Sequence, residues 1–224
     1  TIGVEHQLWS RRVTNDWIAV GAYSTFENKG LIHLNKGNNL VGILIDVESW
    51  NDNNGPAHKT INTGTIKITA GDTTNDPTGG NSIGIDYGEY SNQTFKSELT
   101  VGNIIVAGSK NYGLRMANIF TGNNTYFDKG TTIKSGGAGK KILVQGKKNV
   151  GVSIAKFLSS AANTNPIANI SDLNVTLAGE ESIGFLRNKD YSSNNTNDMV
   201  FDSTTMGVFE LGKGAKNSTL IRTD

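Results

Sequence analysis

The sequence Ile142-Leu-Val-Gln-Gly146-Lys-Lys-Asn-Val-Gly151-Val-Ser-Ile154 contains two short apolar runs, with one glycine after the first run and another inside the second. The same order of apolar, glycine and polar positions recurs in residues 104–116 and 175–187, again with the two glycines five residues apart. Longer versions of the pattern occupy residues 32–45 and 66–87. The chain is therefore built from an internal repeat.

Apolar and polar residues alternate within each copy, as in Val152-Ser-Ile154, which predicts strands with one buried face. Such strands are too short to bury a core alone, so neighbouring copies must stack. The glycine of the second run serves as a marker, and its smallest spacing, about 21 residues, matches a coil of three short strands. We predict an all-β fold, a right-handed parallel β-helix (β-solenoid) of about seven rungs. The markers are Gly21, Gly42, Gly84, Gly113, Gly151, Gly184 and Gly207.

Between the repeats lie polar segments, and all three prolines of the chain fall in them. Proline cannot donate a hydrogen bond to a sheet, so we interpret these segments as loop insertions. They cover residues 47–60, 72–80, 88–98, 117–130, 155–169 and 188–198.

A short polar residue stands two positions before the marker glycine in four copies. Ser and Asn tolerate left-handed backbone dihedrals and can stack on equivalent residues of the next rung. We predict a stacked polar corner made of Ser82, Asn111, Asn149 and Ser182.

Composition excludes several classes of function. The net charge is +1, which gives no overall field for nucleic acid, and we expect no nucleic-acid partner. There is no cysteine, and the three histidines lack ligand spacing, so we expect no metal and no cofactor. No stretch of 18 apolar residues and no export signal is present. We expect residues 1–224 to form a single solenoid segment of a longer protein, with residues 1–16 as a neighbouring rung or a cap.

The motifs Asn28-Lys-Gly30-Leu-Ile-His-Leu34 and Asn62-Thr-Gly64-Thr-Ile-Lys-Ile68, each followed by the marker-glycine strand, carry a family resemblance. From Trp17 to Glu210 the chain resembles the passenger repeats of very large fusobacterial type V autotransporter adhesins. The resemblance implies a secreted virulence protein on the cell surface, on the extracellular side of the outer membrane. It implies a monomeric passenger that attaches to a protein or glycan of host cells or other bacteria. Contact with the outer membrane would occur only through a C-terminal barrel, which this sequence lacks.

Several sequence features point to other chemistry. Right-handed β-helices include carbohydrate-active enzymes that use acidic clusters, and the nearest carboxylates are Asp86 and Glu89, with Asp46 and Glu48 at the corresponding place in the preceding copy. Residues 72–76 offer oxygen atoms without calcium-loop spacing, and residues 136–140 lack a complete phosphate-loop motif. Because lone acids after strands usually face solvent, we expect no catalytic residues and no enzymatic activity.

Two groups of residues are candidates for binding. Four lysines flank one strand, as a basic patch for an anionic glycan or as a solvated edge: Lys140, Lys141, Lys147 and Lys148. Aromatic residues in the insertions could anchor a partner, and we expect Trp50, Tyr126 and Phe127 to be the principal anchors. The alternatives to an adhesive segment are a structural spacer of the passenger stalk and a carbohydrate-active β-helix enzyme.

Overall fold

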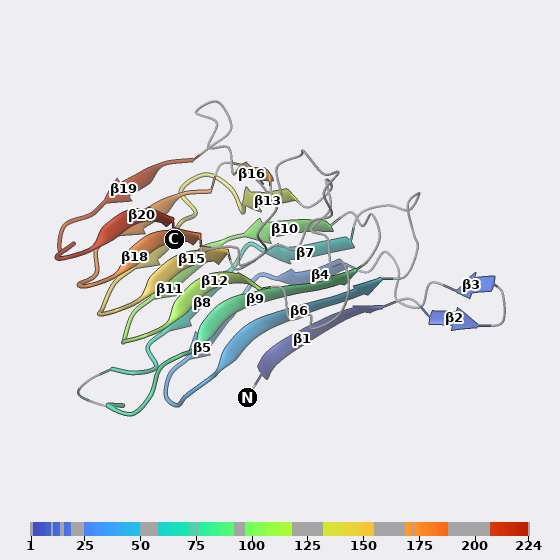
Figure 1. The fold of residues 1–224 in the computed structure, drawn as a ribbon, viewed down its shortest axis with the longest axis horizontal. Helices are drawn as coiled ribbons and strands as arrows, with labels where there is room; N and C mark the ends of the chain where they lie inside the picture. The colour runs from blue at the N-terminus through green and yellow to red at the C-terminus, as the bar shows by residue number, and fades with distance from the viewer. Residues whose placement is uncertain are drawn as a thin grey trace.

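The computed structural model describes residues 2–9, 11–13, 16–18, 25–49, 58–72, 74, 76–91, 97–117, 132–154, 169–171, 173–187 and 207–223. Within these residues all regular structure is β-strand, and no helix occurs. Three parallel sheets run side by side along the molecule, with the two chain termini near opposite ends (Figure 1). The predicted all-β, parallel solenoid is confirmed.

Each turn of the chain contributes one strand to each sheet, in a fixed order. The five-stranded sheet comes first, with β4 (Thr25–Asn28), β7 (His58–Asn62), β10 (Ser97–Val101), β13 (Thr132–Ser135) and β16 (Asn169–Ser171). The six-stranded sheet follows, with β5 (Leu31–Leu34), β8 (Thr65–Ile68), β11 (Asn103–Val106), β14 (Ile142–Val144), β17 (Val175–Leu177) and β19 (Phe209–Leu211).

The seven-stranded sheet completes the turn. It contains β1 (Ile2–Trp9), β6 (Val41–Ser49), β9 (Ile83–Ser91), β12 (Tyr112–Ala117), β15 (Val150–Ile154), β18 (Ile183–Arg187) and β20 (Thr219–Thr223). A separate antiparallel pair, β2 (Arg11–Val13) and β3 (Asp16–Ile18), stands apart from the three sheets (Figure 1).

The described strands make a solenoid of about four turns, because the chain returns four times to the five-stranded sheet between β4 and β16. The prediction of about seven rungs is not confirmed. One cause is Gly207, which is not a marker position: a Cβ atom there would lie 2.5 Å from the carbonyl oxygen of Leu173, at a different corner. Gly21 lies outside the described residues, and strand register instead places Gly3 beside Gly42.

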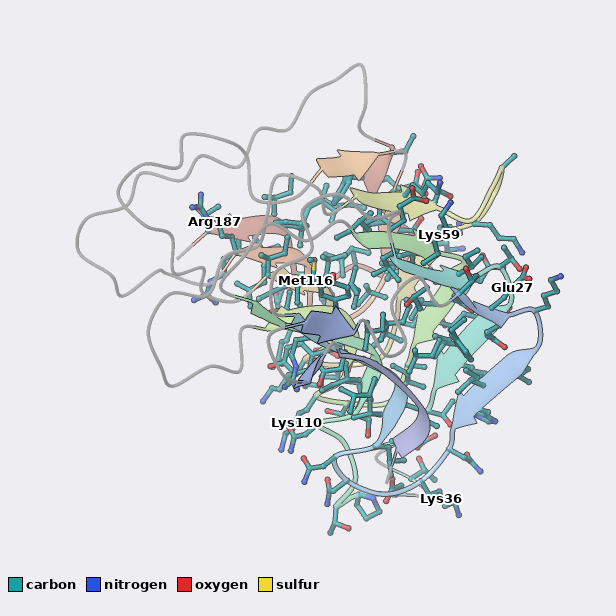
Figure 2. All side chains as sticks on the ribbon, turned by 90° about the vertical axis from the view of Figure 1, so that its right-hand side faces the viewer. Glu27, Lys36, Lys59, Lys110, Met116 and Arg187 are labelled. Atoms are coloured by element: carbon teal, nitrogen blue, oxygen red, sulfur yellow. The ribbon has the colours of Figure 1, made fainter. Side chains whose placement is uncertain are left out.

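The core consists of aligned columns of apolar side chains. In the six-stranded sheet Ile66, Ile104, Ile142 and Val175 are paired in successive strands, and all four have no exposed surface. Figure 2 shows Met116, on the seven-stranded sheet, among the interior side chains. Each such side chain stabilises the fold by roughly 1.5–3 kcal/mol relative to an exposed one. Stacking of the strands therefore joins the alternating apolar residues of the copies into one continuous core.

Five marker glycines do stack on one another, as predicted. A Cβ atom added to Gly113 would lie 2.6 Å from the carbonyl oxygen of Gly151, and one added to Gly151 would lie 2.5 Å from that of Gly184. The same contact links Gly42 to Gly84 and Gly84 to Gly113. None of these glycines has positive φ, so close approach of neighbouring rungs, and not a left-handed backbone, requires glycine here.

The stacked polar corner is also confirmed. The backbone N–H of Ser82 donates to Asn111 Oδ1 at 3.0 Å, that of Asn111 to Asn149 Oδ1 at 2.8 Å, and that of Asn149 to Ser182 Oγ at 3.0 Å. The N–H of Ser182 continues the series to Ser218 Oγ at 2.9 Å. We call these five residues the polar ladder. Its first four side chains are buried, so each bond satisfies a backbone group that water cannot reach.

The left-handed dihedrals were predicted for the wrong residue. They occur one position earlier, in the residue that precedes the ladder side chain. These residues have φ between 49° and 61°, and they are Asn39, Asn81, Lys110, Lys148, Glu181 and Asn217. The positive φ turns the next side chain inward, where it can join the polar ladder. Lys110, Lys148 and Glu181 adopt this φ despite the backbone strain that it causes.

Candidate binding surface

Five of the chain's connecting segments follow strands of the seven-stranded sheet. Residues 50–57, 92–96, 118–131 and 155–168 each join a strand of this sheet to the next strand of the five-stranded sheet, and residues 188–208 join β18 to β19 of the six-stranded sheet. Because the strands are parallel and in register, their carboxyl ends lie in one row along the molecule (Figure 1). The five segments therefore begin along a common edge, which we call the loop corner.

The structure also corrects the insertion boundaries. Residues 47–49 belong to β6, residues 58–60 to β7, residues 88–91 to β9, and residues 97–98 to β10. The insertion at residues 72–80 lies at a different corner, between the six-stranded and the seven-stranded sheets. Strand pairing continues further than the polar composition of these residues indicated.

The three predicted anchors belong to the loop corner segments by sequence. Trp50 begins the first segment, and Tyr126 and Phe127 lie in the third. All three lie outside the described residues. Their role as ligand-binding residues remains a prediction.

The strand register does not pair the acidic residues considered for catalysis with one another. In the register of β6 and β9, Asp46 faces Gly88 and Glu48 faces Tyr90, while Asp86 faces Leu44. The expectation that Asp46 and Glu48 correspond to Asp86 and Glu89 is therefore wrong. Asp46 and Glu48 stand four and six residues after the marker Gly42, whereas Asp86 and Glu89 stand two and five residues after Gly84.

Asp86 has a different partner, Arg115 of the next rung. The guanidinium donates from Nε to Asp86 Oδ1 at 2.9 Å and from Nη2 to Oδ2 at 2.6 Å. The Asp86 side chain is 5% exposed and that of Arg115 36%. The hydrogen bond to Asp86 raises the pKa of Arg115 above its ordinary value. Both carboxylate oxygens of Asp86 accept hydrogen bonds in this bidentate pair, which is suited to binding the two rungs together.

Sequence reasoning missed Arg115, although a signal was present. Asp86 stands two residues after the marker Gly84, and Arg115 stands two residues after the marker Gly113. Residues at the same offset from stacked markers are neighbours in the sheet. Offset from the marker glycine would have identified the pair.

The lysines do not form an open basic patch. Lys147 Nζ lies 2.9 Å from Glu181 and 3.7 Å from Glu180, and Lys148 Nζ lies 3.6 Å from Glu181. Lys216, one rung further, lies 3.8 Å from Glu180. These pairs raise the pKa of Lys147 and lower that of Glu181, chiefly through their mutual hydrogen bond.

Lys140 and Lys141 make no ion pair with another described residue. Two of the four lysines therefore belong to a ladder of alternating charge at the corner opposite the loop corner.

Within residues 72–76, the carboxylates of Asp72 and Asp76 accept backbone hydrogen bonds. Asp76 Oδ2 accepts the N–H of Gly37 at 2.9 Å and that of Gly71 at 3.0 Å, and these bonds lower its pKa. Asp72 Oδ1 accepts the N–H of Thr74 at 2.8 Å. Asp76 thus fixes the inserted turn to the rung before it.

Two other sequence features, His33 and the glycine-rich residues 136–140, make hydrogen bonds within the fold. The imidazole of His33 lies 3.0 Å from the hydroxyl of Thr69 on the neighbouring strand. Residues 136–140 form the turn between β13 and β14, in which the N–H of Lys140 donates to the carbonyl of Gly137 at 3.1 Å. Among the residues that the structure describes, no three His, Asp or Glu side chains are grouped closely enough for a metal ion.

The described part of the chain contains no helix that is long and apolar enough to cross a membrane. Comparison with known proteins adds no relative: no family model, no curated protein and no solved structure matches this chain.

Proposed function

We propose that this chain is a passenger segment of a surface-displayed adhesin, a right-handed β-helix that presents the segments of the loop corner to a protein or glycan on host cells or other bacteria. The observation that carries the proposal is the common edge of the seven-stranded sheet from which the five segments of the loop corner start. Rungs about 4.8 Å apart can combine successive loops into one extended surface.

The outward charges of the strands support the same assignment of roles. On the five-stranded sheet Glu98 lies 3.5 Å from Lys59 and 3.6 Å from Lys134, one rung to each side. At the corner between the six-stranded and the seven-stranded sheets, Glu180 likewise forms ion pairs with a lysine one rung to each side, Lys147 and Lys216. The charges named at these two places are paired with one another, so we assign recognition to the loops.

A spacer is the second candidate, and the same self-paired charges favour it, since they suit an inert stalk. An enzyme is the weaker alternative because Asp86, the most promising acid, is bound to Arg115. We propose that the chain has no enzymatic activity.

Attachment of the isolated chain to epithelial cells and to other bacteria tests the proposal. Replacing the three anchors, Trp50, Tyr126 and Phe127, with Ala should lower attachment severalfold or more, since large aromatic side chains dominate interfaces. The control variant replaces three residues of the six-stranded sheet, Leu31, His33 and Lys67, with Ala. Circular dichroism and thermal melting of both variants should match the parent. If the anchor variant folds and attaches as well as the parent, or if the parent does not attach, the spacer becomes the better account.

A further inference from the structure

The three sheets differ in the side chains that they turn outward. Charged residues face outward on the five-stranded sheet, among them Lys59, Glu98 and Lys134, and on the six-stranded sheet His33 lies beside Lys67. The seven-stranded sheet instead carries an outward row of mainly apolar side chains, one on each of five strands, which we call the apolar row. Its members are paired in register, and they are Val41, Ile83, Tyr112, Val150 and Ile183.

The apolar row faces outward because each member precedes a marker glycine that faces the core. A Cβ atom on Gly84 would lie 3.3 Å from Ile104 Cγ2 and 3.4 Å from Ile66 Cγ2. Successive residues of a strand point to opposite sides, so Ile83 points away from the core. Ile83 and Val150 are only 4% and 8% exposed, although neither belongs to the core cluster. The row is therefore a second apolar layer, on the outside of the sheet.

The position of the apolar row in the solenoid is internal. Its five strands are β6, β9, β12, β15 and β18, and each of them has a neighbouring strand on both sides. Further rungs at either end of the solenoid would therefore leave the row uncovered.

A guanidinium group lies beside the middle of the row. Gly113 and Leu114 both face the core, so Tyr112 and Arg115 are consecutive outward residues of β12. The pKa of Arg115 is raised chiefly by Asp86 and to a smaller extent by Tyr112, which places the phenol within electrostatic range of the guanidinium.

Asp86 fixes this guanidinium without using all of its donors. The carboxylate accepts hydrogen bonds from Nε and Nη2, so the N–H groups of Nη1 remain. Within the described residues, neither Nη1 nor the hydroxyl of Tyr112 has a hydrogen-bond partner. Both side chains are partly exposed, that of Arg115 by 36%. Nη1 and Nη2 together present two parallel N–H groups, which match the two oxygens of a carboxylate.

We propose that the outer face of the seven-stranded sheet binds a segment of a partner protein in which an acidic residue is flanked by apolar ones. The carboxylate accepts hydrogen bonds from Arg115 Nη1 and Nη2 and from the hydroxyl of Tyr112. The flanking apolar side chains pack on the apolar row. This site is formed by the strands and is separate from the loop corner.

Two other occupants fit this face less well. An acidic glycan also carries carboxylates, but its hydroxyl groups would lose hydrogen bonds to water against the apolar row. A second copy, related by a two-fold axis through this site, would bring two Arg115 guanidinium groups together and supply no carboxylate to either.

NMR of the full chain, labelled with 15N, tests the proposal with the peptide acetyl-Val-Glu-Val-amide as the probe. The amide signals of Tyr112 and Ser153 and the Nε signal of Arg115 should shift and saturate. Replacing Glu by Gln in the peptide should weaken binding about tenfold or more, because the charge-assisted hydrogen bonds are lost.

Two variants of the chain separate the donors. Arg115→Lys keeps the charge beside Asp86 but removes the planar fork, and it should weaken binding about tenfold or more. Tyr112→Phe removes only the hydroxyl, which has no partner in the described fold, and it should weaken binding several-fold. Lys67→Ala, which removes a cation from the six-stranded sheet, is the control and should bind as the parent does.

Circular dichroism and thermal melting check that each variant folds. The proposal is overturned if the peptide shifts no signal of this face, as expected if another segment of the same chain occupies it. It is also overturned if the Gln peptide binds equally well, or if Arg115→Lys and Tyr112→Phe both bind as the parent does. Tighter binding of trigalacturonate at the same residues would identify the occupant as a glycan. A dimer in sedimentation that Val41→Asp abolishes would identify it as a second copy, and either result overturns the proposal.

Discussion

Replacing Asn149 with Ala should destabilise the solenoid by an amount that its hydrogen bonds determine. Asn149 is fully buried, and its Oδ1 accepts the N–H of Asn111 at 2.8 Å. Its Nδ2 donates to the carbonyls of Gln145 at 2.5 Å and Gly108 at 3.2 Å. Alanine keeps the backbone and removes all three bonds.

The magnitude follows from the groups left without this partner. The carbonyl of Gly108 keeps a bond from the N–H of Lys147 at 2.9 Å, so its loss is small. The N–H of Asn111 and the carbonyl of Gln145 lose the side chain that satisfies them. Asn111 is buried, whereas Gln145 is exposed, so water can replace the lost bond at the Gln145 carbonyl. One unsatisfied buried group costs about 1–3 kcal/mol, which is the loss expected for the variant. With a slope of about 2 kcal/mol per molar urea, the midpoint should fall by about 0.5–1.5 M.

Urea unfolding followed by circular dichroism measures this shift, and hydrogen exchange at the amide of Asn111 reports the loss locally. Asn149→Ser should recover part of the stability, because the Ser182 hydroxyl accepts the equivalent bond in the next rung. Asn35→Ala, at an exposed position, is the control and should change stability by less than about 0.5 kcal/mol. If Asn149→Ala costs no more than this control, the polar ladder does not stabilise the fold as described.

Three further predictions concern other contacts. Gly113→Val should cost roughly 1–3 kcal/mol in the same urea assay, because its Cβ would meet the carbonyl of the next rung, whereas Gly30→Ala, with its nearest atom 3.9 Å away, should be neutral. Arg115→Ala should cost roughly 2–4 kcal/mol, below a fully buried pair because Arg115 is 36% exposed, and the double variant with Asp86→Ala should cost less than the single one. Asp76 has a pKa below its ordinary 3.8, so its stabilisation is present above that pH and is lost as the pH falls through the lower, folded value; unfolding of Asp76→Asn should therefore depend less on pH in that acidic range.

Much of the architecture could be predicted because stacking leaves a periodic trace in the sequence. Five marker glycines and four ladder residues were assigned from position alone, and the structure confirms both sets. The number of rungs could not be predicted from the marker glycines. The marker position of the last described rung is occupied by Leu220, and Gly207 lies at a different corner.

Local conformation was less accessible to sequence. Lys110, Lys148 and Glu181 adopt positive φ although none of them is a residue type that favours it, and each precedes a residue of the polar ladder. The partner of Asp86 depended on register, which the sequence shows only after the copies have been aligned on the marker glycine. Contacts between rungs therefore depend on how the repeat copies are aligned, which the pattern within one copy does not show.

The claim that recognition takes place at the loop corner can be tested directly by shielding one side of the solenoid at a time. The chain has no cysteine, so a single introduced cysteine can carry a polyethylene glycol chain. Lys59 is the second residue of β7, directly after the first loop segment, and Lys110 lies at the opposite corner (Figure 2). Lys59→Cys and Lys110→Cys remove the same charge. We predict that the polymer at position 59 abolishes attachment to cells and that the polymer at position 110 leaves it unchanged; equal loss at both positions, or loss only at position 110, would contradict the account.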